Sequence, residues 1–161
     1  MKVVLTGASG FLGGHICKAL FGEPNVDLCA VVRSPKSIMA DRVVEISDIG
    51  VETDWSSVLT GENVVIHAAA QAHIVGKDEA KLLTEYRRVN VDGTLNIARQ
   101  AASSGVRRFI FISSIGVNGN CNLSPFTEMD VPCPKGLYAQ SKWEAEQGLW
   151  EIQRETGMEL V

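Results

Sequence analysis

The sequence predicts an α/β protein with a Rossmann-like, doubly wound parallel sheet. Short apolar runs, which suit strands buried on both faces, alternate along the chain with segments of helical periodicity. The first run, residues 3–5, leads into glycines at positions 7, 10 and 13 and then into an amphipathic stretch at 11–21. Strands and helices that alternate in this way form parallel sheets, whose ligands bind at the carboxyl ends of the strands.

Gly7, Gly10 and Gly13 predict a nucleotide site at the first strand–helix turn. Glycine permits a positive φ and lets a ligand approach the backbone closely. The following helix N-terminus offers free N–H groups and a positive dipole end, which suit a pyrophosphate. The G-x-x-G-x-x-G spacing is one residue wider than the common dinucleotide fingerprint. The alternative is an ordinary strand–turn–helix, but the position directly after an apolar strand favours the nucleotide site.

The composition suits one domain, residues 1–161, with no nucleic-acid or membrane partner. The chain has 161 residues and a net charge of −4, and its basic residues form no stripe. No apolar run approaches a membrane span, and Thr6 and Gly7 interrupt the N-terminal stretch too early for a signal peptide. The cysteines lack metal-ligand spacing, so we expect no metal and reduced thiols in a cytoplasmic protein, although a Cys121–Cys133 disulfide stays open.

The second strand, residues 28–32, ends in Arg33 and Ser34, which bear on the choice of cofactor. Dinucleotide folds that prefer NAD usually place an acidic residue here to hold the ribose hydroxyls, whereas an arginine accommodates the 2′-phosphate of NADP. Because the basic residue Arg33 stands where an acidic residue is expected, NADP is the favoured cofactor and NAD is the alternative. Arg33 could also simply be solvated at the strand end.

Further strands are expected at 42–47, 63–70 and 108–114, and helices at 80–103 and 137–155, with a polar loop at 116–135. Asn90 in the middle of the 80–103 helix is a poor helix former, so it either faces solvent or makes a specific contact. Gly105 is expected to end that helix. Residues 158–161 begin another apolar strand, and we therefore expect a sheet truncated at the start of its sixth strand.

Tyr138 and Lys142 are four residues apart and share one face of the last helix. A cation beside a phenol favours the phenolate, which should shift the titration of Tyr138 from about 10 toward neutral pH. Tyr138 is therefore a candidate general acid/base. Ser113 and Ser114 end the fifth strand on the ligand side, where a hydroxyl could hydrogen-bond a substrate oxygen. The alternative interpretation of the Y-x-x-x-K spacing, taken alone, is that Tyr138 and Lys142 are simply exposed on the surface of the helix.

These motifs resemble those of the extended short-chain dehydrogenase/reductases, the NAD(P)-dependent epimerase/dehydratase family, which acts largely on nucleotide sugars. The resemblance runs in order through TGASGFLG (6–13), VNVDGTLN (89–96), FISS (111–114) and YAQSK (138–142). The segments AAAQAH (68–73), SSIGVNG (113–119), FTE (126–128) and SKWEAE (141–146) are similar to a bacterial subgroup. That subgroup includes UDP-glucose 4-epimerase-like proteins and nucleotide-sugar 4-ketoreductases.

The resemblance implies roles for particular residues. Those expected to bind the cofactor lie in the glycine turn, after the second and third strands, at the end of the fourth strand and on the last helix: Gly7, Gly10, Phe11, Leu12, Gly13, Arg33, Ser34, Asp48, Ile49, Ala68, Ala69, Ala70, Tyr138 and Lys142. Within this set, Asp48 and Ile49 would flank the adenine. Ser114 and Tyr138 would contact the reacting oxygen, Lys142 would hold the nicotinamide ribose, and Asn90 would help to fix the active-site geometry.

The resemblance also has departures and leaves alternatives. Gly136 and Leu137 stand where the family commonly has a proline before the tyrosine, so the local turn is expected to differ. The family's C-terminal substrate domain is expected to lie outside residues 1–161, and this chain alone is therefore expected to be inactive. The expected function is epimerase or 4-ketoreductase chemistry on a nucleotide sugar, with a UDP-linked sugar as the expected substrate. The alternatives are a non-sugar carbonyl reductase and an NADP(H)-binding redox sensor without turnover.

A homodimer is expected for the full-length protein, because related enzymes pair the helices that correspond to 80–103 and 137–155. Leu83, Leu95, Trp143 and Leu149 could supply its apolar contacts. Alternatively, these residues all face the sheet of their own chain.

Overall fold

The computed structural model of the chain describes all residues except 35–36, 62, 75 and 77. Its strands are β1 (Lys2–Thr6), β2 (Asp27–Val32), β3 (Arg42–Glu45), β4 (Val64–His67), β5 (Arg108–Phe111) and β6 (Glu159–Leu160). Its helices are α1 (Phe11–Leu20), α2 (Glu79–Arg87), the π-helix η1 (Arg88–Gly93), α3 (Thr94–Ser103), the 3₁₀ turn η2 (Ile115–Val117) and α4 (Leu137–Thr156).

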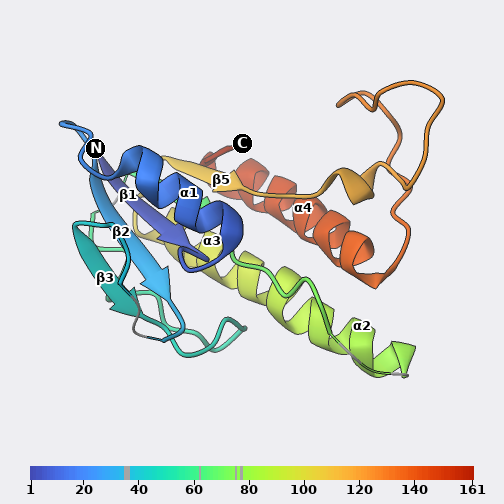
Figure 1. Cartoon of the computed structure of the whole chain (residues 1–161), viewed down its shortest axis with the longest axis horizontal. Coiled ribbons are helices and arrows are strands. Elements are labelled where there is room, and N and C mark those ends of the chain that lie inside the picture. The colour runs from blue at the N-terminus through green and yellow to red at the C-terminus, as the bar shows by residue number, and fades with distance from the viewer. Residues whose placement is uncertain (35–36, 62, 75, 77) are drawn as a thin grey trace.

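In the described part of the chain, the six strands form one parallel sheet in the order β3-β2-β1-β4-β5-β6 (Figure 1). The chain winds outward from β1 to one side and then crosses to β4 and continues to the other side. A doubly wound sheet of this order has its ligand crevice between β1 and β4, at the carboxyl ends of the strands. The predicted Rossmann-like fold is confirmed.

The apolar runs of the central strands are continuous because both faces of the sheet are covered. Val3 and Leu5 pack in a cluster with Leu28 and Cys17 on the α1 face. Val4 belongs to a second cluster that includes residues of α3 and α4. Figure 1 shows α1 on one face and these two helices on the other. Successive residues of one strand thus enter different cores, as the two-residue period of a strand requires.

The predicted strands at 42–47, 63–70 and 108–114 were too long at their carboxyl ends, because the chain leaves the ladder there to form the loops of the site. The strands end at Glu45, His67 and Phe111. The sixth strand is confirmed, since Glu159 and Leu160 pair in parallel with Arg108 and Phe109 of β5.

The predicted 80–103 helix is continuous in space but not uniform, because η1 interrupts it with a π-helical segment that contains Asn90. Segments of this kind often occur at functional sites. Gly105 ends the helix as predicted: its φ is +79°, and the Val106 N–H donates to the Ala101 carbonyl at 3.0 Å.

The loop after η2 carries Cys121 and Cys133 as exposed free thiols, so the disulfide left open by the sequence is not formed. Among the helices that the structure describes, none has the length and apolar character needed to cross a membrane.

Candidate active site

The glycine turn after β1 is held by close backbone contacts. Gly7 has a φ of +71°, and a Cβ atom on it would lie 2.6 Å from the Ala69 nitrogen. A Cβ on Gly13 would lie 2.1 Å from the Gly7 carbonyl oxygen. Any larger side chain would therefore push the turn away from the loop after β4 or from α1. No side chain caps α1 at Gly10, so its first-turn N–H groups face the turn and suit an anion.

A groove of about 280 Å³ runs along this turn at the carboxyl ends of β1, β2 and β4. Predicted cofactor residues make up much of its lining: Gly7, Gly10, Arg33, Asp48, Ile49, Ala68, Ala69 and Ala70. The small alanines and the glycine turn leave the backbone open to a ligand, and Arg33 and Asp48 supply charge at the far end. The described residues therefore fit a dinucleotide.

Six predicted cofactor residues lie outside the lining of this groove, of which Tyr138 and Lys142 are described below. Phe11 and Leu12 are exposed at the start of α1, with 88% and 45% of their surface accessible. Gly13 is buried beneath the turn, where it serves packing, and Ser34 is exposed beside Arg33. The resemblance assigned these residues to the cofactor from their positions in the sequence. Residues that are neighbours in one turn need not all line the groove.

The groove also contains residues that the sequence analysis missed: Ser9, Ile46, Gln71, Arg88 and Val89. Ser9 and Gln71 adjoin predicted residues and could have been included on that ground. Arg88 offered no such signal, since it lies forty positions from the Asp48 carboxylate that it contacts.

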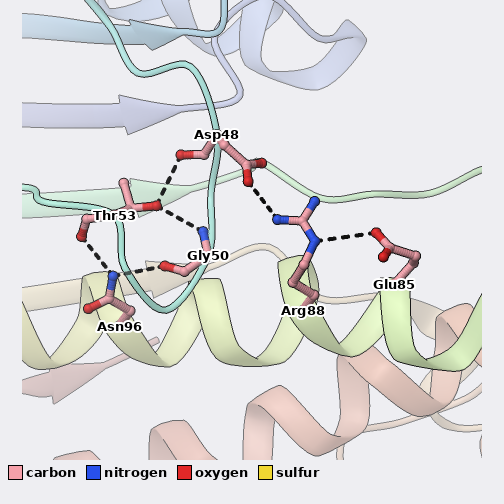
Figure 2. Close-up of polar contacts among 6 residues, drawn as sticks. All are labelled: Asp48, Gly50, Thr53, Glu85, Arg88 and Asn96. Atoms are coloured by element: carbon pink, nitrogen blue, oxygen red, sulfur yellow. Dashed lines mark hydrogen bonds and ion pairs between the residues drawn. The ribbon is translucent and has the colours of Figure 1, made fainter.

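The far rim of the groove is a polar network between the loop after β3 and the long helix (Figure 2). The Arg88 guanidinium donates through Nη1 to Asp48 Oδ2 at 2.6 Å and through Nε to Glu85 Oε2 at 3.3 Å. Asn96 Nδ2 donates to the carbonyls of Gly50 and Thr53 at 2.9 and 2.8 Å. The bond from Arg88 lowers the pKa of Asp48, so that its carboxylate is ionised and accepts hydrogen bonds.

Beneath the groove, His67 links β1, β4 and α3. Its Nδ1 lies 2.8 Å from the Thr6 hydroxyl and its Nε2 lies 3.1 Å from the Thr94 hydroxyl. Thr6 Oγ1 also accepts the Ala69 N–H at 3.3 Å, which ties the alanine loop to β1. Burial, together with the nearby positive charge of Lys142, lowers the pKa of His67 to about 3, so the ring is neutral.

Asn90 makes the specific contacts that explain its mid-helix position, so the solvent-facing alternative is wrong. The side chain is 1% exposed. Its Oδ1 accepts the Gln71 N–H at 2.8 Å, and its Nδ2 donates to the Gln71 carbonyl and to Ser141 Oγ, each at 3.0 Å. Ser141 Oγ in turn donates to the Tyr138 carbonyl at 2.8 Å. Asn90 therefore connects the groove, through Gln71, to the helical turn that carries Tyr138.

Ser114 and Tyr138 line one cavity of about 360 Å³ together with Leu82, Tyr86 and Gly136. Ser114 caps the short η2 helix, and its Oγ accepts the Gly116 N–H at 3.2 Å. The Tyr86 and Tyr138 ring centres are 6.2 Å apart. The two residues predicted to contact the reacting oxygen thus come to the same cavity from the loop after β5 and from α4.

Lys142 does not line that cavity. Its ammonium lies 3.8 Å from the centre of the Phe111 ring and the residue is 1% exposed. Burial lowers the pKa of Lys142 to about 7, and the carboxylate of Glu146 opposes that change. Glu146 accepts a short hydrogen bond from the Ser113 hydroxyl, which follows the end of β5.

The expected shift in the titration of Tyr138 is wrong for the chain as described. Burial raises the pKa of Tyr138, and the neighbouring Tyr86 raises it further. The sequence placed the tyrosine and the lysine on one helix face, but it could not show that burial raises the pKa of the phenol and lowers the pKa of the ammonium group.

Gly136 precedes α4 with a φ of +83° and a ψ of 156°. Proline fixes φ near −65° and could not take this conformation. The turn before Tyr138 therefore requires glycine, which accounts for the expected departure at this position.

Residues 3–161 match the family model for the NAD dependent epimerase/dehydratase family. The chain belongs to this family. It is 41% identical to a UDP-glucose 4-epimerase of Vibrio cholerae over 99% of its length, which is 49% of that protein. It is 34% identical to a UDP-glucose 4-epimerase of Klebsiella pneumoniae over 80% of its length, covering 99% of that protein.

Among solved structures of the epimerase/dehydratase fold, MoeE5 in complex with UDP-glucuronic acid and NAD superposes with a TM-score of 0.85. It is 27% identical over 99% of this chain, which corresponds to 52% of MoeE5. The chain thus spans about half the length of the Vibrio epimerase and of MoeE5.

Proposed function

We propose that residues 1–161 are the dinucleotide-binding Rossmann domain of a nucleotide-sugar 4-epimerase or 4-ketoreductase. The observation that carries the proposal is that Ser114 and Tyr138 share a cavity that Asn90 connects to the glycine-turn groove. The names of the relatives support a UDP-linked sugar as substrate. The sugar site would be completed by residues that belong to a separate substrate domain and are not in this chain.

NADP is the proposed cofactor, with NAD as the alternative. The Arg33 side chain at the groove supports NADP, because a guanidinium pairs well with a phosphate monoester. The NAD in the MoeE5 complex supports the dinucleotide class and keeps NAD open. When bound, the nicotinamide would take up and return a hydride at the sugar carbon.

In this mechanism the residues of the chain bind, orient and transfer a proton. The turn at Gly7 and Gly10 would hold the pyrophosphate, and Lys142 would hold the nicotinamide ribose. Ser114 would donate a hydrogen bond to the reacting oxygen. Tyr138 would take the hydroxyl proton as the carbon is oxidised and return it on reduction, as a general acid/base.

The full-length protein tests this proposal with UDP-glucose, UDP-galactose and their 4-keto derivatives. Epimerisation is followed by separation of the sugar products, and reduction by nicotinamide absorbance. We expect turnover of a nucleotide sugar by the full-length protein and none by residues 1–161 alone, which should bind cofactor only. Tight NADP(H) binding without turnover of any sugar would favour the alternative of a redox sensor. Turnover of a non-sugar carbonyl compound, and of no nucleotide sugar, would favour the alternative of a non-sugar carbonyl reductase.

A further inference from the structure

The end of β5 meets the last helix through two side-chain contacts. The Lys142 ammonium lies over the Phe111 ring, 3.8 Å from its centre. The Ser113 hydroxyl donates a short hydrogen bond to Oε1 of Glu146. Lys142 and Glu146 are four residues apart on α4, so they lie on the same face of that helix. The carboxylate of Glu146 is therefore held at the strand end where the ammonium of Lys142 lies.

The titratable groups around Lys142 give its charge little other support. His67 of β4 is neutral, because its own pKa is lowered to about 3. Tyr138, one turn earlier on α4, is also neutral near pH 7, because burial raises its pKa. Tyr86 of α2 packs against the Tyr138 ring and offers a phenol there. By contrast, the charge of Glu146 raises the pKa of Lys142 and opposes the effect of burial.

Docking of α4 against β5 does not require a charge at position 146. The Ser113 hydroxyl needs only an acceptor, and a neutral amide oxygen accepts a hydrogen bond as a carboxylate oxygen does. Glu146→Gln therefore keeps an acceptor for Ser113 and removes the negative charge near Lys142. This substitution separates a structural role of Glu146 from an electrostatic one.

We propose that Glu146 is a positioning residue that keeps Lys142 charged for cofactor binding, because Ser113 holds its carboxylate at the strand end where the ammonium lies. The inference rests on the proposed role of Lys142, which would hold the nicotinamide ribose. A charged ammonium is a stronger hydrogen-bond donor than a neutral amine. Cofactor affinity should therefore fall as the pH rises through the pKa of Lys142, which is about 7. Without the carboxylate this pKa is lower, so the fall should begin at a lower pH.

Glu144 provides a matched control on the same helix. Its carboxylate accepts two bonds from Arg87, each 2.7 Å, and one from Gln140 Nε2 at 3.0 Å. It is engaged by α2 and by its own helix, whereas Glu146 is engaged by the end of β5. Glu144→Gln therefore removes one carboxylate from α4 without touching the bond between Ser113 and Glu146.

The first measurement is a pH titration of the lysine side chains of the chain by heteronuclear NMR. The Lys142 signal is identified by its loss in Lys142→Met. We expect it to titrate near pH 7 in the wild type and about one pH unit lower in Glu146→Gln. Ser113→Ala, which frees the carboxylate, should give an intermediate value. Glu144→Gln should titrate as the wild type does.

The second measurement is calorimetric titration of the chain with NADPH and with NADH at pH 5.5, 7 and 8. Glu146→Gln should bind as the wild type does at pH 5.5 and about threefold or more weaker at pH 7 and 8. In the Lys142→Met background, Glu146→Gln should have little effect, which excludes a direct action of the Glu146 charge on the anionic cofactor. Circular dichroism at each pH checks that every variant is folded.

The outcomes are distinguishable. If the Lys142 signal titrates at the same pH in Glu146→Gln and in the wild type, the inference is overturned, whether or not a cofactor binds. If the signal moves but the affinities of the two proteins change with pH in parallel, the inference is also overturned while the dinucleotide site stands. If the folded wild type binds neither NADPH nor NADH, the proposed function fails and the inference fails with it.

Discussion

The ammonium group of Lys142 lies over the Phe111 ring, 3.8 Å from its centre, although the residue is buried almost completely. The ring and the carboxylate of Glu146 stabilise the charged form, whereas burial disfavours it. The balance leaves the pKa of Lys142 at about 7, below the ordinary value of 10.5. The charge of this residue therefore changes close to neutral pH.

Lys142→Met should stabilise the chain, and the gain should depend on pH. Between pH 7 and 10.5 the folded state binds fewer protons at this group than the unfolded state, so wild-type stability rises with pH across that window. The penalty for the buried charge is fully present below pH 7. We expect the variant to be more stable by on the order of 2 kcal/mol at pH 6, with the difference shrinking toward pH 10.

Urea unfolding of both proteins at pH 6, 8 and 10 measures this difference. The pKa of His67 is lowered from 6.5 to about 3, so this residue affects stability at acid pH in both proteins. Loss of the Lys142 charge should make the lowering of the His67 pKa smaller in the variant. A stability difference that is constant with pH would show that Lys142 is not buried as a titrating group.

Tyr138→Phe should remove most turnover in the full-length protein and leave cofactor affinity nearly unchanged. Tyr138 lines the cavity shared with Ser114 and does not line the dinucleotide groove. General acid/base catalysis is worth about 10²–10⁴-fold in rate, so the loss should be of that size. Ser114→Ala should cost less, because it removes a hydrogen bond but no proton carrier. Steady-state kinetics and cofactor titration measure the two effects separately, and wild-type turnover by Tyr138→Phe would refute the mechanism.

Arg33→Asp should narrow or reverse a preference for NADP(H) over NAD(H). One charge-assisted contact to the 2′-phosphate is worth about 1.5–3 kcal/mol, which is at least about tenfold in affinity. Calorimetric titration of both cofactors into wild type and variant measures the ratio. Tighter NAD binding by the wild type would contradict the assignment of Arg33 and agree with the NAD in the MoeE5 complex.

Asn90→Ala should destabilise the chain by about 1–3 kcal/mol, because it leaves the Gln71 N–H and carbonyl without their partner in a half-buried site. Asn90→Asp should be intermediate, since it can still accept the Gln71 N–H but cannot donate to the carbonyl or to Ser141. Asn122→Ala in the exposed loop is the control, with an expected change within about 0.5 kcal/mol. Chemical denaturation gives the three values, and equal stability of Asn90→Ala and the control would contradict this role.

The full-length protein should be a homodimer that pairs α2–α3 and α4 with those of a second copy. The structure changes which residues are available for this contact. Leu149 is 1% exposed within its own core, and Leu95 packs against Gly148, so these two predicted contacts are used inside the chain. Trp150, 48% exposed on α4, is a better candidate. Light scattering should show a dimer at micromolar concentration that Trp150→Glu weakens, and a wild-type monomer would contradict the prediction.

The sequence by itself determined the fold class, the order of the elements and the glycine turn. These features depend on residues that are near neighbours in the chain. Three apolar residues followed by Gly7, Gly10 and Gly13 specify a strand, a turn and a helix through backbone conformation and short-range packing. The Tyr138–Lys142 spacing specifies a shared helix face for the same reason.

The tertiary structure alone decided the electrostatics and the partners of these residues. The contact between Asp48 and Arg88 joins a loop to a helix forty positions away, and no local pattern encodes it. Asn90 looked like a poor helix residue until the Gln71 loop and α4 were placed beside it. The pKa values of Tyr138 and Lys142 depend on how much water the packed helices exclude, which is a property of the assembled fold. Burial is a sum over distant segments, and for that reason it moved the pKa of Tyr138 in the direction opposite to the one that sequence spacing had suggested.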